Sequence, residues 1–295
     1  MTSITFASYR KAVVALLFVS LGVVARGQNL LARSEVGLTG GGMNYLGDLN
    51  DQSMFGTVNL AGGLTARINL DTRWAVAFGG VYGHIEGGNP DVVWRRNLSF
   101  KSQIAEGFAR VEFNFFPYGL HHGTQKRATP YIFCGVGFFK FNPQAQYVDS
   151  LSGMGTWYDL QPLGTEGQGT RAYPDRTKYQ LFEVCMPFGI GYRWRISPSV
   201  HLTVEYGWRK TWTDYLDDVS TTYVGADVLA GEDGGGTMAA ILADRSGEVV
   251  PGYVNGVGIK RGDDSLDDWY SYFNVSLSFS AEMLFGWMRG KRCEL

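Results

Sequence analysis

Hydrophobic and polar residues alternate along several stretches of this chain, which is the side-chain period of a β-strand. The clearest case is 58–70, where Leu60 and Leu64 share one side of the predicted strand and Asn59 and Arg67 lie on the other. The same alternation runs through 104–115, 180–196, 200–212 and 269–279, and it is weaker in 35–46, 73–85 and 130–141. The pattern therefore predicts eight strands.

The predicted strands are long, at about 10 to 17 residues each. About 9 to 11 residues cross a bilayer in a tilted strand, whereas soluble strands average about five or six. The connections near 69–73, 118–129 and 197–199 are short or moderate, and those near 47–55, 86–99, 142–178 and 213–268 include the two longest. Short periplasmic turns and long outer loops are typical of outer-membrane barrels. We therefore expect an all-β fold, an eight-stranded antiparallel transmembrane β-barrel.

The N-terminus has the layout of a secretory signal peptide. Arg10 and Lys11 precede an apolar run of about 14 residues, shorter than the roughly 20 that a membrane-spanning helix needs. Small residues at Ala25 and Gly27 suit cleavage after Gly27. We expect residues 1–27 to be a signal peptide and 28–295 to form one barrel domain in the bacterial outer membrane. An uncleaved anchor helix is the alternative.

Periodicity does not decide which face points outward, because a soluble ligand-binding barrel alternates in the same way with its apolar face inside. Strand length, unequal loops and the leader favour the membrane. The polar faces then fill the lumen, which in an eight-stranded barrel is only wide enough for side chains. The predicted lumen charges are Glu106, Arg110, Glu112, Glu183, Arg193, Arg195, Glu205 and Arg209. We expect them to pair and plug the barrel, with an ion-conducting path as the alternative.

Composition supports this class. The chain has 40 glycines, 14% aromatic residues and 18% charged residues, against about 25% charged in soluble domains. A net charge of −2 provides no basic surface for nucleic acid. The three cysteines, Cys134, Cys185 and Cys293, are odd in number and far apart, which argues against a disulfide framework.

Candidate chemistry is sparse. Among four histidines, only His84 is expected at the outer end of a strand; a Ser/His/Asp set around it stays open, but no spacing marks a nucleophile. The adjacent His121 and His122 could bind a metal, although solvated side chains on a turn are the simpler interpretation. We therefore predict no enzyme, no catalytic or metal site and no cofactor.

The long loops hold two acidic clusters, 214–218 and 263–268, whose carboxylates could supply Ca²⁺ ligands. Neither has the spacing of an EF-hand, so we expect solvated loop carboxylates. The glycine-rich 231–236 and the small residues after it are predicted to be flexible.

Several strings are more specific than composition. They are NYLGDLN at 44–50, RRNLSFKS at 95–102, ATPYIFCGVGFFKFNP at 128–143, LGTEGQG at 163–169, TDYLDDVSTTY at 213–223 and DDWYSYF at 267–273. In this order they resemble the PorG family, outer-membrane barrels of the type IX secretion system of Bacteroidetes, over about 35–279. The stretch 225–262 looks like an insertion relative to that family.

The resemblance implies a barrel that contacts a periplasmic ring of the lipoprotein PorK with PorN and anchors it to the outer membrane. Such machinery exports proteins and in some members supports gliding. From topology, we expect the partner to contact the periplasmic connection 118–129, with His121, His122, Lys126 and Arg127 as candidates. The other function left open is a small barrel that binds a ligand or partner through its long outer loops.

Overall fold

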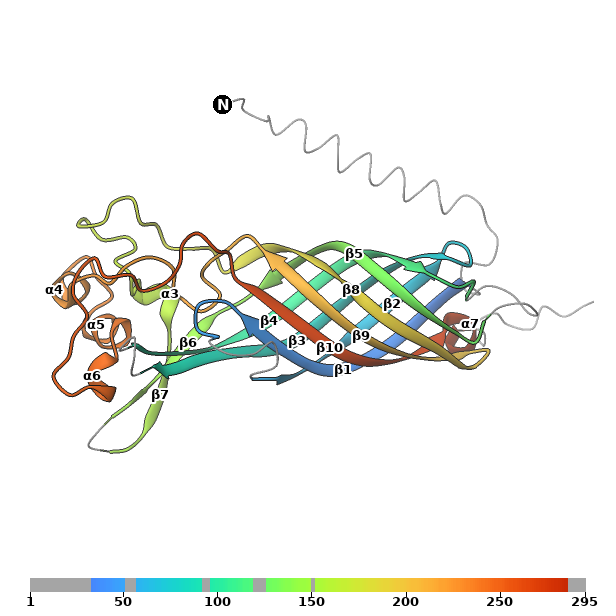
Figure 1. Ribbon diagram of the computed structural model, residues 1–295, viewed down its shortest axis with the longest axis horizontal. Coiled ribbons are helices and arrows are strands. Elements are labelled where there is room, and N and C mark those ends of the chain that lie inside the picture. The colour runs from blue at the N-terminus through green and yellow to red at the C-terminus, as the bar shows by residue number, and fades with distance from the viewer. Residues whose placement is uncertain (1–32, 51–56, 92–95, 119–125, 150–151, 286–295) are drawn as a thin grey trace, which may run out of the picture.

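The computed structural model describes residues 33–50, 57–91, 96–118, 126–149 and 152–285. Within them, eight long strands form a closed ring (Figure 1). These strands are β1 (Ser34–Leu46), β2 (Asn59–Asn69), β3 (Trp74–Asp91), β4 (Arg96–Asn114), β5 (Ala128–Lys140), β8 (Phe182–Ser197), β9 (Val200–Thr211) and β10 (Trp269–Ser280). Neighbours pair antiparallel, and the ring closes where β10 pairs with β1. The predicted eight-stranded antiparallel barrel is confirmed.

The two ends of the barrel differ. One end, the turn end, carries the connections 70–73 and 198–199, the described residues 115–118 and 126–127 of a third connection, and the short helix α7 (Ala281–Phe285) (Figure 1). The opposite end, which we call the cap end, carries the long loops. Short turns at one end and long loops at the other are the outer-membrane arrangement, which places the turn end in the periplasm. The predicted signal peptide at 1–27 lies outside the described residues.

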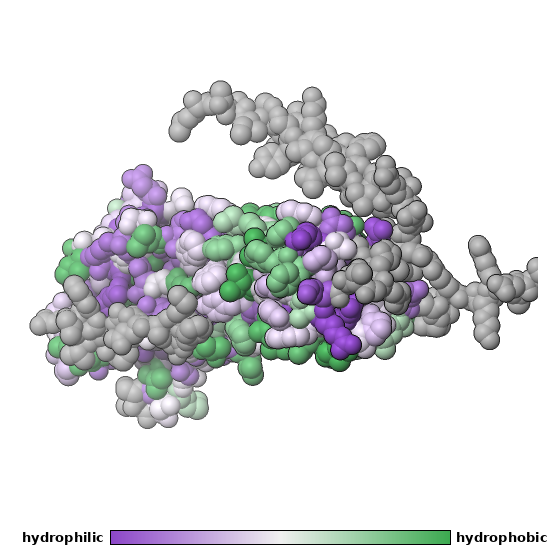
Figure 2. Space-filling view, turned by 45° about the vertical axis from the view of Figure 1, so that its right-hand side comes forward, coloured by the Kyte–Doolittle hydropathy of each residue, from purple (hydrophilic) through white to green (hydrophobic). Residues whose placement is uncertain are grey.

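Apolar side chains point away from the barrel axis. Leu38, Leu60 and Ile190 are 64%, 84% and 57% exposed, whereas Glu112 and Arg193 on the opposite strand face are fully buried. Hydrophobic side chains cover the middle of the barrel in Figure 2, and hydrophilic ones gather toward both ends. A soluble barrel would have its apolar face inside, so that alternative is wrong. The closed ring, which pairs its strands on both edges and turns its apolar face outward, is the structure of an outer-membrane barrel.

No helix in the described parts of the chain combines the length and the apolar character needed to span a membrane. Cys134 and Cys185 are both free thiols.

The half of the lumen nearer the cap is filled by apolar and aromatic side chains, which the alternation did not predict. Ile104, Phe139 and Tyr270 are all fully buried there, and the same cluster continues into the loops through Leu216. In β5, Phe138 points outward and Phe139 inward. Because both faces of these strand ends are apolar, the period of two is lost in the sequence.

Two strands run beyond the barrel wall. The predicted outer connection 86–99 is wrong, because β3 continues to Asp91 and β4 begins at Arg96, with Glu86 opposite Lys101 in the ladder. The extension supports a small sheet, in which β6 (Pro143–Val148) pairs with β4 and β7 (Gly155–Asp159) pairs with β6.

The described residues of 142–181 (142–149 and 152–181) fold together with 212–268 into what we call the cap. Besides β6 and β7, it contains α3 (Leu160–Leu163), α4 (Ala226–Ala230), α5 (Thr237–Ala243) and α6 (Ser246–Val249), all at one end of the molecule (Figure 1). The small residues after 231–236, which were predicted to be flexible, instead form α5, in which Ala239 and Leu242 are buried. Small residues permit this packing, since a Cβ on Gly235 would lie 2.1 Å from the carbonyl oxygen of Leu163.

Candidate functional site

The centre of the lumen is an ion-pair network around Glu112. This fully buried carboxylate lies 2.6 Å from Arg67 Nε, 2.9 Å from Arg110 Nη2 and 2.8 Å from Arg193 Nη2. β2, β4 and β8 contribute these arginines, so one glutamate links three parts of the ring. A buried carboxylate and a buried guanidinium are each costly alone, and their pairing offsets that cost.

Further pairs extend the network. Arg110 contacts both carboxylate oxygens of Glu205, at 2.6 Å from Nη1 and 2.9 Å from Nη2. Arg67 also lies 3.1 Å from Glu35. Closer to the cap, Arg209 lies 3.1 Å from Glu106. The network therefore fills the lumen from β1 round to β9 with side chains.

Six of the eight predicted lumen charges are brought into these pairs: Glu106, Arg110, Glu112, Arg193, Glu205 and Arg209. The other two, Glu183 and Arg195, are half-buried near opposite ends of β8 and form no ion pair within the described residues. The prediction missed Glu35 and Arg67. Arg67 lies on the polar face of the best alternating segment, which is the signal that identifies it, and Glu35 opens a strand whose alternation is weak.

A buried tyrosine lies at the turn end of the lumen network. Tyr118, from the connection between β4 and β5, is fully buried, and its hydroxyl lies 2.6 Å from Nδ1 of His201. The guanidinium of Arg193 lies 5.6 Å from the centre of the Tyr118 ring and 4.5 Å from that of Tyr131. The connection is thus attached to the same network that fills the lumen.

The candidate partner-contact residues lie on this connection. Lys126 and Arg127 are exposed, while His121 and His122 lie outside the described residues. The backbone here is held at both sides: the Lys126 N–H donates to the Pro117 carbonyl at 3.3 Å, and the Arg195 N–H donates to the Arg127 carbonyl at 2.7 Å. Two cationic side chains are therefore presented on a segment with fixed backbone.

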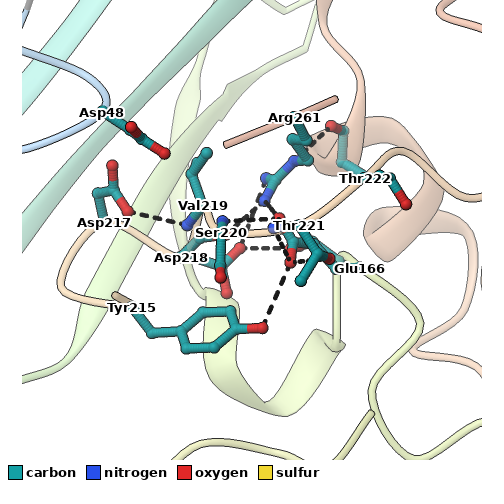
Figure 3. A network of polar contacts seen from close by, with 12 residues as sticks. Asp48, Glu166, Tyr215, Asp217, Asp218, Val219, Ser220, Thr221, Thr222 and Arg261 are labelled. Atoms are coloured by element: carbon teal, nitrogen blue, oxygen red, sulfur yellow. Dashed lines mark hydrogen bonds and ion pairs between the residues drawn. The ribbon is translucent and has the colours of Figure 1, made fainter. Parts of the chain in front are cut away.

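A second network holds the cap together around Glu166 (Figure 3). This carboxylate is fully buried and accepts hydrogen bonds from the backbone N–H groups of Ser220 at 2.9 Å and Thr221 at 3.0 Å. Its Oε1 lies 3.0 Å from Nη1 of Arg261. Glu166 belongs to LGTEGQG and Ser220 and Thr221 to TDYLDDVSTTY, so two of the distinctive strings bind each other.

Asp218 is the second carboxylate of the cap network. It accepts hydrogen bonds from the hydroxyls of Thr165 and, at 2.7 Å, Tyr179, and lies 3.6 Å from Nη2 of Arg261. Burial raises the pKa of Asp218 to about 6, and the positive charge of Arg261 opposes that shift. Its φ of 66° is in the left-handed region, which an aspartate tolerates better than most residues.

A third contact joins the cap to the barrel. The hydroxyl of Tyr45, near the end of β1, lies 2.7 Å from both Asp217 Oδ2 and Asp268 Oδ1. Backbone N–H groups of Val219 and Leu216 bind the remaining oxygens of the two carboxylates. Burial raises the pKa values of Asp217 and Asp268 above their usual range, and each is raised further by acidic neighbours.

The acidic clusters were predicted to be solvated, and for three carboxylates this is wrong. Asp217, Asp218 and Asp268 are 1%, 0% and 1% exposed, because the cap folds over the barrel mouth and buries them against tyrosines. Within the described residues, no group of three or more His, Cys, Asp or Glu side chains is arranged to hold a metal ion. These carboxylates instead bind backbone N–H groups and hydroxyls.

His84 lies on the outward face of β3, opposite Gln103 of β4. It forms no hydrogen bond with a serine or carboxylate of the described chain, so the Ser/His/Asp set considered from the sequence is not assembled there.

Comparisons with known proteins place these features in context. A family described only as a domain of unknown function, DUF6089, matches residues 10–154, a span that ends before Glu166. No curated protein matches the chain.

Among solved structures, the chain is similar to Ail, the attachment invasion locus protein of Yersinia pestis (8% identity, 83% of this chain and 96% of that chain, TM-score 0.36). Neisserial surface protein A is also similar (8%, 84% and 96%, TM-score 0.38), as is OprG of Pseudomonas aeruginosa (11%, 83% and 96%, TM-score 0.36). The fold assignment itself rests on the strand ring and its two faces.

Proposed function

We propose that this protein is an outer-membrane anchor of the type IX secretion system, which holds a periplasmic ring of PorK-like lipoprotein and PorN-like protein at its turn end. The single observation that favours an anchor is a filled lumen combined with two exposed cationic side chains, Lys126 and Arg127, whose backbone is hydrogen-bonded at the turn end. The particular assembly is suggested by the strings that resemble the PorG family.

A closed lumen is unsuited to transport through the barrel. The ion pairs around Glu112 fill its centre, the aromatic cluster with Phe139 and Tyr270 fills the half nearer the cap, and buried Tyr118 packs against Arg193 at the turn end. A barrel that passes no solute can still attach other proteins to the membrane. The proposal is therefore for a structural, non-enzymatic role.

The turn end offers a suitable contact surface. Lys126 and Arg127 are exposed there, and Arg73 at the neighbouring connection is exposed as well. Asp71 on that neighbouring connection is committed to local hydrogen bonds with the N–H groups of Arg73 and Trp74. Such a surface suits a partner with an acidic face.

The test is charge reversal on the connection. In cells that contain the ring proteins, the double variant Lys126→Glu, Arg127→Glu is expected to insert normally but to retain about tenfold less ring protein in a pull-down from solubilised outer membranes. Arg171→Glu, an 88% exposed arginine on the cap, is the matched control and should retain the ring fully. Equal ring retention by the double variant and the wild type would contradict the proposed contact.

One observation favours the second function, binding of an outside partner by the loops. Val254, Val257 and Leu266 of the cap are 72%, 65% and 66% exposed. If this function is correct, Val254→Ser, Val257→Ser will abolish partner retention while Lys126→Glu, Arg127→Glu leaves it intact. The two double variants thus separate the two proposals.

A further inference from the structure

The outward wall of the barrel contains a groove that none of the features above explains. It has a volume of about 490 Å³ and lies across β1 to β4, lined by Gly40, Leu60, Gly62, Tyr82, His84 and Lys101, among others. All six of these residues occupy outward positions on their strands, so the groove opens toward the membrane and not into the lumen. An occupant must therefore be a component of the membrane.

The floor of the groove is bare backbone. Gly40 and Gly62 are direct partners in the β1–β2 ladder. A Cβ on Gly40 would meet nothing within 4 Å, and one on Gly62 would meet only the Thr39 carbonyl oxygen, at 3.3 Å. Space therefore exists for larger outward side chains at both positions. Because glycine occupies both, the wall is hollowed between strongly exposed Leu60 and Tyr82.

The rim toward the cap is polar and carries the cationic side chain of Lys101. Lys101 is half-buried and forms no ion pair or hydrogen bond with another described residue. Its ladder partner is Glu86, and His84 is its diagonal neighbour across the β3–β4 pair. Glu86 offsets part of the charge, so any anion held here must also use neutral donors.

Gln103 provides such a donor. The Tyr82 hydroxyl donates to Gln103 Oε1 at 3.0 Å, which fixes the amide and leaves its NH₂ group available at the groove. The groove has apolar sides and a glycine floor, and its end near the membrane surface carries the Lys101 ammonium group and the Gln103 amide. An amphiphile with an anionic head group has the matching chemistry. A lysine near the bilayer surface extends its ammonium group toward lipid head groups.

We propose that this groove binds an outer-leaflet lipid of the lipid A type, with an acyl chain over Gly40 and Gly62 and a phosphate against Lys101. Leu60 and Tyr82 contact the chain along its sides. Gln103 and His84 hydrogen-bond the head group. The site is separate from the turn end and does not depend on the proposed anchor role.

The experiment uses the purified full chain in dodecyl maltoside, titrated with diphosphorylated lipid A in the same micelles and followed by native mass spectrometry. Lys101→Glu is expected to weaken lipid A binding at least tenfold, which corresponds to about 1.4 kcal/mol. Gly40→Phe fills the groove and is expected to weaken it similarly. Phosphatidylcholine should bind the wild type at least tenfold more weakly than lipid A.

Two variants are matched controls. Lys140→Glu reverses the charge of a second lysine at the cap end of the wall, which is exposed and lies outside the groove lining. Gly107→Phe adds a ring at another outward glycine whose Cβ would meet nothing within 4 Å. Both should bind lipid A like the wild type. All variants must keep the heat-modifiable electrophoretic mobility of a folded barrel.

Unchanged lipid A binding in Lys101→Glu or in Gly40→Phe would overturn the inference. So would equal losses in the matched controls, because binding would then be a general property of the wall. Loss of a co-purifying membrane protein from Lys101→Glu, with lipid A binding unchanged, would assign the groove to a protein partner instead.

Discussion

Nη1 of Arg261 lies 3.0 Å from Oε1 of Glu166, and both side chains are almost completely buried inside the cap. The two residues are 95 positions apart in the chain, so the pair joins the segment after β7 to the segment before β10. Glu166 also binds the backbone of Ser220 and Thr221. One carboxylate therefore holds three distant segments of the outer loops.

Replacing Glu166 by Gln should loosen the cap but leave the barrel folded. The change leaves Arg261 buried with Asp218 as its remaining carboxylate, at 3.6 Å. Removing one member of a buried ion pair costs about 3 to 5 kcal/mol. We expect rapid trypsin cleavage within 212–268, with the heat-modifiable mobility of the barrel retained.

Glu248→Gln is the control for that variant, because Glu248 is 48% exposed in its pair with Arg245. Exposed pairs contribute about 0 to 1 kcal/mol, so the cap should resist trypsin as in the wild type. A Glu166→Gln cap as resistant as that of Glu248→Gln would refute the importance of the network.

Replacing Glu112 by Gln should destabilise the barrel itself. The carboxylate pairs with Arg67, Arg110 and Arg193, and without it Arg193 loses its ion-pair partner within the described chain. We expect the free energy of unfolding to fall by about 3 kcal/mol or more, measured by urea titration in lipid vesicles. Glu282→Gln, at an exposed position of α7, should change it by less than about 0.5 kcal/mol. Similar decreases in the free energy of unfolding in both variants would argue against a stabilising role of the ion pairs around Glu112.

The cap should be more stable at mildly acidic pH than at neutral pH. Burial raises the pKa of Asp218 to about 6 and that of Asp214 to about 7, and it raises those of Asp217 and Asp268 as well. The folded cap thus holds protons that the unfolded chain, with aspartate pKa values near 4, releases. The stabilisation from Asp218 and Asp214 is complete below about pH 4 and is lost as the pH rises through their pKa values in the folded cap.

Hydrogen exchange of the cap amides measures this directly, and we expect stronger protection at pH 5 than at pH 7.5 after correction for the intrinsic exchange rate. Asp217→Asn keeps an oxygen for the Val219 N–H and does not ionise, so its cap should show a smaller change between the two pH values. Protection of the cap amides that rises with pH in the wild type would show that the predicted direction of the pH dependence is wrong.

The barrel should not conduct ions, either intact or without the larger segment of its cap. The lumen is filled by the Glu112 pairs and by Phe139 and Tyr270, none of which belongs to the cap. In planar bilayers we expect no steady current from the wild type or from a variant whose residues 214–267 are replaced by a short Gly/Ser linker. Current from the linker variant alone would show that the segment 214–267 closes the barrel, and current from the wild type would contradict a filled lumen.

The sequence by itself determined the barrel. Alternation is a local property, because neighbouring side chains of a strand point to opposite faces whatever the strand pairs with. The stretch 104–115 therefore separated Glu106, Arg110 and Glu112 from the outward residues before any fold was known. The number of strands, their order and most of the lumen charges follow from the same period and from loop length.

The tertiary structure alone decided which groups meet. Pairing of Arg110 with Glu205, insertion of Tyr118 beside His201 and burial of Asp217 with Asp268 under Tyr45 all need the ring to close or the loops to fold back. The acidic strings look solvated in the sequence because the tyrosines and the arginine that bury them lie far away in the chain. Burial of a charge depends on such distant partners, whereas the face of a strand depends only on its own residues.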